Sequence, residues 1–417
     1  MKKVFIFIIL IIIGIFAFFF YKSYMKEEKL TDILENVEEE FVINRLSIFG
    51  THLNINGCID KKLDSLELVL KNKKEEITLQ SNIEVKDDET CFYTSKNNND
   101  GIYLDDLKEG KFIMLIKSGE EYYTLKDETN SKKLEYYTVT REEKNNKIDI
   151  IFDKVESKNY IELDVLQSKL PDNVYDIAID PGHGGKDSGA SGKIDGKEYY
   201  EKDSTLEIAK LLKKELEKEG LKVKLTRDSD TNLSNYDEGG RAVIANEFNT
   251  KYSISIHLNS STGTQKYGGV EVYVPNDVDL TLAKLLSKNI AYKFNYSKKQ
   301  TDKLDDGIYF TYLDENDIKD ANKKMEENDM EPYDIEEGAP YMFMIRELGG
   351  INTHAYVDGR NEYYGLNPYY NSNKTTEPYL IEMAYMNYES DLRKIINEPE
   401  IFASAIKNAL CEYLNIS

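Results

Sequence analysis

The spacing of apolar residues changes near residue 170 and divides the chain into two parts of different fold class. Between about residues 45 and 164, apolar and polar residues alternate in short runs such as KFIMLIKS and KIDIIFDKV, separated by polar turns. Alternation with a period of two is typical of half-buried strands. Because no segment of helical period interrupts these runs, residues 45–170 are predicted to form an all-β, sandwich-like accessory domain of antiparallel strands.

From residue 175 to residue 417, predicted strands alternate with segments of helical period. The strands are expected at 175–180, 221–226, 252–256, 269–274 and 379–385, and the helices at about 203–219, 241–248, 280–292 and 398–414. This order predicts an α/β domain with a mixed sheet flanked by helices. Two stretches, near 302–338 and 349–376, fit the pattern poorly and are interpreted as insertions, most simply as solvated loops.

An uncharged apolar run occupies residues 4–20. At about 1.5 Å per helical residue it nearly crosses a hydrocarbon core of about 30 Å. We therefore interpret residues 1–26 as a single-pass transmembrane anchor and residues 27–44 as a polar linker. Lys2 and Lys3 favour a cytoplasmic amino terminus and an extracytoplasmic body in the cell envelope. A cleaved signal peptide is the alternative, although its apolar core is usually shorter and precedes a small-residue cleavage site.

Charge and cysteine content narrow the class of partner. The chain has 54 basic and 76 acidic residues and a net charge of -22, which argues against a nucleic-acid partner. Cys58 and Cys91 both lie in the β-rich part, and an oxidising exterior would permit a disulfide between them, but unpaired cysteines remain the alternative. Cys411 is interpreted as a packing residue in the last helix, and His52 as structural or solvent-facing.

Two histidines at predicted strand ends are candidates for metal ligands. His183 stands in the glycine-rich segment DPGHGG, and His257 follows the alternating run YSISI. Carboxyl ends of strands are where open α/β sheets form their sites. Zinc sites often combine neutral imidazoles with one carboxylate and leave a position open for water. Glu201, just ahead of the first predicted helix, can supply that carboxylate.

Glu382 is an acidic residue inside an otherwise apolar predicted strand, in the segment PYLIEMAYMNYESD. Burial of an unpaired carboxylate costs free energy, so this one is expected to face a metal site or to have a raised pKa. A carboxylate with a raised pKa, close to activated water, is suited to act as a general base.

Taken together, DPGHGG, EKD, SIHLNS and IEMAYMNYESD resemble, in order and spacing, the zinc-dependent catalytic domain of N-acetylmuramoyl-L-alanine amidases, over residues 175–417. The resemblance implies hydrolysis of the amide between the lactyl group of N-acetylmuramic acid and L-alanine in peptidoglycan. It implies Zn2+ as the cofactor, His183, Glu201 and His257 as its ligands, and Glu382 as the catalytic base. Arg346 is similar to the family's arginine before the last strand, and is predicted to bind a substrate carboxylate or Glu382.

Departures from the family pattern leave alternatives open. The last strand reads EMAY where the family usually has E-x-G-F, and the segment after Arg346 is longer than in the family. His354, in that segment, is interpreted as a surface histidine, with a role at the site as the alternative. Glu198 and Glu207 are the alternatives to Glu201. Another zinc peptidase of the cell wall and a wall-binding protein without turnover are the alternative functions, and the sequence identifies no activating protein.

Overall fold

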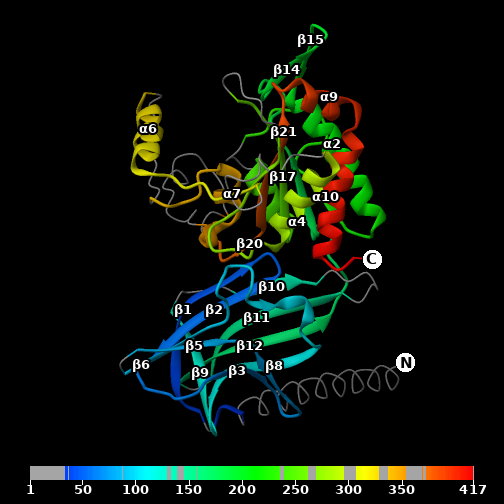
Figure 1. Ribbon diagram of the computed structural model, residues 1–417. Coiled ribbons are helices and arrows are strands. Elements are labelled where there is room, and N and C mark those ends of the chain that lie inside the picture. Colours follow the sequence, from blue (N-terminus) through cyan, green and yellow to red (C-terminus); the bar gives the residue numbers. More distant parts are fainter. Residues whose placement is uncertain are drawn as a thin grey trace, which may run out of the picture.

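The computed structural model describes residues 33–416 except 36, 87, 129–132, 139–144, 156, 235–238, 262–268, 295–306, 328–336, 354–368 and 370–371. Within this part of the chain, a β-rich amino-terminal region and an α/β carboxyl-terminal region pack against each other end to end (Figure 1). No helix of the described part is both long enough and apolar enough to cross a membrane. The apolar run at 4–20, the predicted anchor, lies outside the described residues.

The amino-terminal region, here called the accessory domain, is built from one large sheet with the strand order β10-β11-β12-β8-β9-β1-β2-β6-β5 along its main path. Apolar side chains of alternate strand positions, such as Phe41, Ile43, Phe112 and Met114, are fully buried in its core. Its strands are β1 Val37–Phe49, β2 His52–Ile59, β3 Glu67–Lys71, β4 Glu76–Leu79, β5 Asn82–Lys86, β6 Glu89–Tyr93, β7 Ile102–Tyr103, β8 Gly110–Ser118, β9 Glu121–Asp127, β10 Leu134–Tyr137, β11 Asn146–Val155 and β12 Lys158–Gln167.

Two expectations for this region need correction. Strand β1 begins at Val37, so residues 37–44, which were predicted to belong to a linker, form part of the sheet. The strands also belong to one continuous sheet, and β1 pairs with β9 in parallel, whereas an antiparallel sandwich was expected. Hydrogen bonds from Asn159 to Glu40 show why acidic residues are tolerated here, because Glu40 binds the neighbouring chain segment while Phe41 fills the core.

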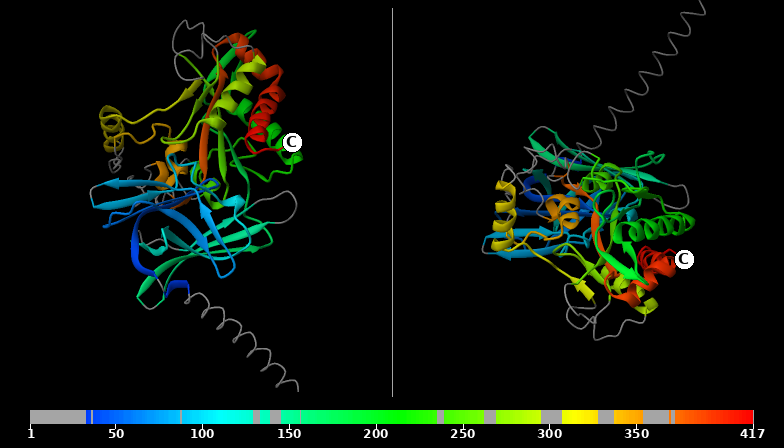
Figure 2. Two further views of the ribbon diagram at one scale, coloured as in Figure 1. Left: turned by 60° about the horizontal axis from the view of Figure 1, so that its bottom comes forward. Right: turned by 90° about the horizontal axis from the view of Figure 1, so that it is seen from above.

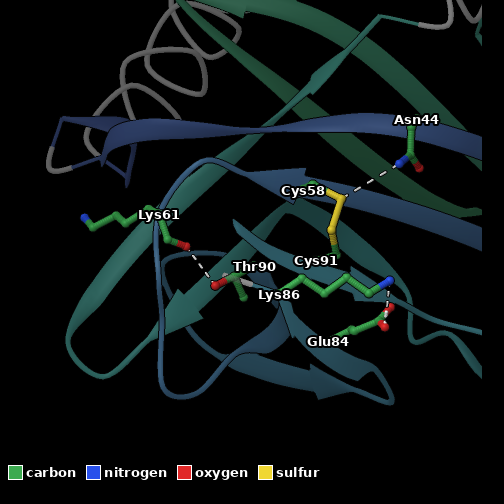
Figure 3. Close-up of a disulfide and its surroundings, with 7 residues drawn as sticks. All are labelled: Asn44, Cys58, Lys61, Glu84, Lys86, Thr90 and Cys91. Atoms are coloured by element: carbon green, nitrogen blue, oxygen red, sulfur yellow. Dashed lines mark hydrogen bonds and ion pairs between the residues drawn. A yellow bond between two sulfur atoms is a disulfide. The ribbon is translucent and has the colours of Figure 1, made fainter. Parts of the chain in front are cut away.

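Cys58 and Cys91 form a disulfide, which decides between the two alternatives left open by the sequence. The two residues lie opposite each other on the antiparallel strands β2 and β6 (Figure 3). Thr90, next to Cys91, donates a hydrogen bond to the carbonyl of Lys61 and joins the same two chain segments. The disulfide therefore links two neighbouring strands that are already paired by backbone hydrogen bonds. Cys411 is a free, buried cysteine, as expected for a packing residue.

The carboxyl-terminal region contains a six-stranded sheet with the order β16-β13-β17-β21-β18-β19. The first four strands are parallel, and β18 runs antiparallel to β21, so the predicted mixed sheet is confirmed. A separate hairpin, β14–β15, precedes the first helix. The strands are β13 Ile177–Pro181, β14 Ser191–Ile194, β15 Lys197–Tyr200, β16 Val223–Leu225, β17 Tyr252–Asn259, β18 Glu271–Tyr273, β19 Ile308–Tyr309, β20 Lys374–Thr375 and β21 Glu377–Tyr385.

Helices cover both faces of this sheet. Helices α2, α4 and α10 pack on one face, where Ile179, Ile254 and Ile381 belong to the main core. Helices α3 and α7 cover the other face around Ala178. Seen from above, α2 and α10 lie on one side of the sheet and α7 on the other (Figure 2). The helices are α2 Glu201–Lys218, α3 Arg241–Glu247, α4 Thr281–Phe294, α6 Glu315–Glu326, α7 Phe343–Leu348, α9 Glu389–Asn397 and α10 Pro399–Tyr413.

The first predicted insertion is not simply a solvated loop. It contributes β19, which pairs with β18 and extends the sheet, and it contains helix α6. From the second insertion the structure describes a 3-10 helix at Gly350–Thr353 and strand β20. His354 lies outside the described residues.

The two domains meet at the amino-terminal ends of the strands of the carboxyl-terminal sheet. Strand β20 pairs in parallel with the end of β1, so it belongs to the accessory sheet. The polar turn after β6 also crosses the boundary: the amide nitrogen of Asn98 donates to the carbonyls of Asn276 (3.2 Å) and Asn352 (3.1 Å). Asn99 donates to the carboxylate of Glu377 at 2.8 Å. A turn predicted only to connect two strands thus holds the domains together.

Candidate metal and catalytic site

His183, Glu201 and His257 come together at the opposite, carboxyl-terminal end of the sheet. Their ligand atoms all lie within 4.8 Å of one another. The carboxylate of Glu201 stands between the imidazoles, 3.1 Å from Nε2 of His183 and 3.1 Å from Nδ1 of His257. Two imidazoles and one carboxylate form a donor set that zinc accepts, with room for a further ligand. The three residues predicted as metal ligands therefore form one cluster.

Alternation along the strands explains which side of the sheet carries this cluster. In β17, Ile254, Ile256 and Leu258 point into the main core, so Ser255 and His257 point to the other face. In β21, Ile381 and Met383 fill the core, and Glu382 consequently points to the same face as His257. Strand β17 continues to Asn259, three residues past the predicted strand end at residue 256.

Glycines allow the chain to approach the two histidine rings closely. A Cβ atom at Gly182 would lie 2.4 Å from Cε1 of His257, and one at Gly189 would lie 2.5 Å from Oε2 of Glu201. His183 itself has a φ of 61°, a value that only a few per cent of non-glycine residues adopt. Such a backbone conformation persists only where its surroundings hold it.

Two arginines hold this loop by its carbonyl oxygens. Arg227 donates to the carbonyls of Pro181 and Gly182, both at 2.9 Å. Arg241 donates to the carbonyl of Pro181 at 2.8 Å and to that of His183. These contacts fix the backbone on both sides of the strained residue. Neither arginine was singled out from the sequence as part of the site.

Asp180 provides the counter-charge for Arg241. It is fully buried and accepts hydrogen bonds from Arg241 (2.7 Å), Thr226 (2.6 Å) and Ser255 (2.8 Å). Burial alone would raise the pKa of Asp180, but Arg241 and the two hydroxyl groups outweigh burial and lower it. Asp180 is the first residue of the DPGHGG motif, at the end of an apolar strand. This position is a signal in the sequence for an arginine partner, since a buried charge requires a cation beside it.

Glu201 is fixed by the start of helix α2 and by two backbone amides. It is the first residue of the helix and only 2% exposed. Its carboxylate accepts from the N–H groups of Ala190 and Leu258, both at 2.8 Å. The positive end of the helix dipole also favours a negative charge at this position. The two alternatives, Glu198 and Glu207, are exposed and lie apart from the cluster, so only Glu201 meets the histidines.

Asp187 is the hydrogen-bond partner of the other nitrogen of His183. Its Oδ2 lies 2.7 Å from Nδ1 of His183, which leaves Nε2 directed at Glu201. The N–H of Gly189 donates to the second carboxylate oxygen of Asp187 at 3.1 Å. This arrangement fixes the tautomer and the orientation of the imidazole. The sequence showed Asp187 two residues after the glycine pair but did not assign it a role.

Charges in the cluster shift the pKa of each member. Burial lowers the pKa of His183, but the hydrogen bonds and charges of Glu201 and Asp187 outweigh burial and raise it to about 9. Burial likewise opposes, and Glu201 and Glu382 support, the raised pKa of His257. The pKa of Glu201 is well below its usual range, because both imidazoles outweigh its burial. Without a metal ion, the imidazoles of the cluster therefore hold protons more tightly than usual, and a metal ion must displace these protons in order to bind.

Glu382 lies beside the cluster without joining it. It is the register partner of His257 in the parallel pair β17–β21. Burial raises its pKa to about 7, opposed by His257 and reinforced by Glu201 and Glu271. Its Oε2 is buried and has no hydrogen-bond partner in the described structure. A carboxylate oxygen of this kind is available to accept a proton near neutral pH.

A pocket of about 280 Å³ opens in front of the cluster. His183 and His257 contribute to its polar side, and Met342, Phe343 and Leu380 to its apolar side. Met342 and Phe343 lie at the start of helix α7, after the first insertion, and Leu380 lies in strand β21. A pocket lined by both polar and apolar side chains can hold a polar group at the histidines, while its apolar side chains exclude bulk water.

Arg346 does not contact Glu382 in the structure. It is 4% exposed, and NH1 donates to the carbonyls of Pro340 (2.7 Å) and Tyr341 (3.4 Å). The guanidinium group thus binds the segment that leads into Met342 and Phe343. The ion pair with Glu382 that was one of the two predicted roles is therefore not formed, because the side chain turns toward its own loop.

His52 does not add to the site. His52 packs against Tyr103, with ring centroids 5.4 Å apart, and hydrogen-bonds Thr51 at 3.2 Å. Burial lowers its pKa to about 4, although Asp100 and Asp105 oppose this. It is a structural histidine of the accessory domain, as expected.

Comparison with known proteins relates this geometry to a family. Residues 177–322 match the family model described as N-acetylmuramoyl-L-alanine amidase. Over this segment the chain is similar to N-acetylmuramoyl-L-alanine amidases. A curated relative, "Probable cell wall amidase LytH" of Staphylococcus aureus, is 38% identical over 148 residues, which are 35% of this chain and 43% of that protein. The chain therefore matches less than half the length of the curated relatives.

Solved structures of amidases are also similar to the chain. The N-acetylmuramoyl-L-alanine amidase from Clostridium difficile 630 shares 25% identity, with a TM-score of 0.39, and covers 58% of this chain and 98% of its own. The catalytic domain of CwlV from Bacillus (Paenibacillus) polymyxa var. colistinus shares 22% identity, with a TM-score of 0.39, and covers 58% and 100%. Because both TM-scores are 0.39, the relation of the chain to amidases is inferred from the sequence matches and not from the superpositions.

The matched segment of the amidase domain includes His183, Glu201 and His257 and ends before Arg346 and Glu382. In the structure the same sheet and core continue through β21 and α10, so the domain as folded extends beyond the matched segment. The three candidate metal ligands therefore lie within the segment that matches the family, whereas Glu382 lies outside it.

Proposed function

We propose that this protein is a zinc-dependent amidase that hydrolyses the bond between N-acetylmuramic acid and L-alanine in peptidoglycan. The observation that carries the proposal is the cluster of His183, Glu201 and His257 with Glu382 beside it, within an amidase domain. Its fit to zinc follows from the donors themselves: two imidazole nitrogens and one carboxylate converge from three elements, and Asp187 orients one ring.

The reaction would use the residues of the chain as follows. His183, Glu201 and His257 would hold the zinc ion, which would supply Lewis acidity to the scissile carbonyl and to the attacking water. Glu382 takes a proton from that water at its free Oε2 and returns it to the leaving nitrogen of L-alanine. Its pKa of about 7 suits both transfers, because the same group must accept and then donate a proton near neutral pH.

The remaining residues position the substrate and exclude water. Met342, Phe343 and Leu380 line the same pocket as the two histidines and would limit the water around the scissile bond. We propose that Arg346 acts as a positioning residue for this wall, since it binds the carbonyls of Pro340 and Tyr341. Contact of Arg346 with a substrate carboxylate stays a prediction.

We also propose that residues 4–20 anchor the protein in the cell membrane with the catalytic domain outside, in the cell envelope. The uncharged apolar run and the lysines before it support this placement. Intact-mass analysis of the protein purified from membranes tests the anchor. A mature chain that starts near Tyr24 would refute it and indicate a cleaved signal peptide.

The test of the activity is the analysis of products from purified peptidoglycan. The full chain should release peptides that begin with L-alanine and should contain stoichiometric zinc. Peptides that begin with another residue would identify a different zinc peptidase, and zinc binding without released peptide would identify a wall-binding protein.

A matched pair of variants tests the proposed base. Glu382→Gln keeps the size of the side chain but removes the proton acceptor, so we expect turnover to fall by about 10² to 10⁴ while zinc content stays unchanged. Glu400→Gln, at an exposed position of α10, serves as the control and should keep full activity. Substantial turnover by Glu382→Gln would exclude Glu382 from the role of base.

A further inference from the structure

A cavity of about 110 Å³ lies at the boundary between the two domains. It is lined by Gly50, Tyr136 and Tyr137 of the accessory domain and by Asn249 and Lys374, which lie in the segments that lead into strands β17 and β21 of the amidase domain. The amidase residues precede strands β17 and β21, so the cavity lies at the end of the sheet opposite the metal cluster. It is therefore separate from the pocket used in the proposed reaction.

The charge of this cavity is unusual for the chain. The net charge of the protein is -22, yet the described residues that line the cavity include Lys251 and Lys374 and no aspartate or glutamate. Lys251 is 5% exposed and has its own counter-charge, because its Nζ lies 3.3 Å from Asp105. Lys374 differs from Lys251 because its ammonium group contacts an amide oxygen and not a carboxylate.

The ammonium group of Lys374 is bound by a neutral partner. Its Nζ donates to Oδ1 of Asn249 at 2.8 Å, and no carboxylate of the described residues is within ion-pair distance of it. Burial lowers the pKa of Lys374 to about 8, with some compensation from Glu135, so the group still carries its charge at neutral pH. Burial of a charge without a counter-charge costs free energy, which a ligand of opposite charge would recover.

We infer that this interdomain cavity binds a small oxyanion, a phosphate or carboxylate group, with Lys374 as its counter-charge. The volume is enough for one tetrahedral oxyanion or for a few water molecules, at about 30 Å³ each. Lys374 and Ser372 are half-buried, so the group can enter as a free ion or as the end of a larger molecule. Because the walls come from both domains, a bound anion favours the docked arrangement over the separated one.

Calorimetric titration of the full chain with inorganic phosphate, at constant ionic strength maintained with chloride, tests this inference. We expect saturable binding and a rise in the thermal unfolding midpoint with phosphate concentration. Absence of saturable binding at millimolar phosphate would overturn the proposal. Glycerol 3-phosphate in the same titration separates the sources: equal binding supports a terminal phosphate, and binding of inorganic phosphate alone supports a free ion.

Two variants locate the site, and each alters the charge in a different way. Lys374→Met removes the cation, and Asn249→Asp places a carboxylate beside it, at a position where the backbone φ of 47° suits aspartate as well as asparagine. Both should weaken phosphate binding about tenfold or more. Asn249→Asp should in addition raise the unfolding midpoint without phosphate, which shows that it folds.

The control variant is Lys284→Met, which removes an exposed lysine of α4 and should leave phosphate binding unchanged. Equal phosphate binding by wild type, Lys374→Met and Asn249→Asp would overturn the proposal. None of these residues lies at the metal cluster, so amidase activity should persist in all three variants, and loss of the proposed function would leave the anion result unaffected.

Discussion

At the scale of single residues, Asp187 holds the imidazole of His183, one of the proposed metal ligands. Its carboxylate holds Nδ1 at 2.7 Å, and it is itself held by the N–H of Gly189. A partner of this kind raises the basicity of the ligating imidazole as well as fixing its orientation. The contribution of Asp187 should therefore appear in metal affinity even though it does not touch the metal.

We predict that Asp187→Asn weakens zinc binding about 10-fold to 100-fold, because the amide accepts a hydrogen bond but lacks the charge. Competition with a chromophoric chelator measures this affinity. Asp172→Asn, an exposed position before β13, provides the control and should bind zinc as the wild type does. Unchanged affinity of Asp187→Asn would mean that Asp187 only stabilises the loop.

Residues whose chemistry is unusual for their position in the sequence could be identified as site residues. Residues whose role depends on the direction in which their side chain points could not. His183 and His257 could be predicted because strand ends collect functional side chains, and Glu382 because an acid interrupts an apolar run. The direction of Arg346 could not be predicted, since its contact with Pro340 depends on how the loop before α7 folds back. Arg227 binds carbonyls, which leave no pattern in a sequence.

At the scale of elements, the loop between β13 and the hairpin β14–β15 depends on a close approach of backbone to side chain. Gly182 faces the ring of His257 so closely that a methyl group has no space. Moving either the loop or the ring would separate His257 from Glu201. This loop therefore couples the identity of one glycine to the geometry of the whole cluster.

We predict that Gly182→Ala abolishes high-affinity zinc binding and turnover while the fold is retained, since the added Cβ would lie 2.4 Å from His257. Zinc content after dialysis and circular dichroism check the two parts of this prediction. Gly196→Ala is the matched control: Gly196 has a positive φ of 80°, but nothing lies within 4 Å of an added Cβ. It should lose some stability and keep its zinc. Stoichiometric zinc in Gly182→Ala would contradict the prediction.

Most strands and helices of the α/β part could be predicted from their periodicity, and the exceptions have physical causes. Strand β1 was missed because Glu38, Glu39 and Glu40 follow one another and obscure the alternation that begins at Phe41. Strand β19 has two residues and α6 is highly charged, so neither gives an apolar pattern of its own. The pairing of β1 with β9 and β20 joins distant segments, which local periodicity does not encode.

At the scale of the whole molecule, a buried carboxylate lies in the contact between the domains. Glu377 is fully buried at the start of β21, and its Oε1 accepts hydrogen bonds from Asn99 and Tyr379. Its Oε2 has no partner in the described structure. Burial raises the pKa of Glu377 to about 7, although Tyr379 and Asn99 oppose this. The docked form therefore prefers the protonated side chain.

The stability of the molecule should respond to pH through this group. A carboxyl group whose pKa is raised on folding stabilises the native state below its unfolded pKa of 4.5, and this contribution is lost as pH rises toward 7. We predict that Glu377→Gln gains stability relative to wild type over that range, by up to about 3 kcal/mol, since one pKa unit corresponds to about 1.4 kcal/mol.

Urea unfolding at several pH values between 4 and 8 measures the difference. Glu400→Gln, at an exposed position, should run parallel to wild type throughout. If Glu377→Gln also ran parallel to wild type, the native carboxyl group would titrate at its ordinary pKa, and the contact between the domains would not depend on its proton.

The pairing of β1 with β20 has a consequence for the order in which the chain can fold. Strand β1 is among the first elements to be synthesised, whereas Lys374 and Thr375, which complete one of its sides, are among the last. Contacts between such distant segments form slowly, because the loop entropy must be overcome first. Until then, the end of β1 presents unpaired backbone groups that other chains can bind. A nascent or exported chain that stops before β20 would therefore be most prone to aggregate at this edge.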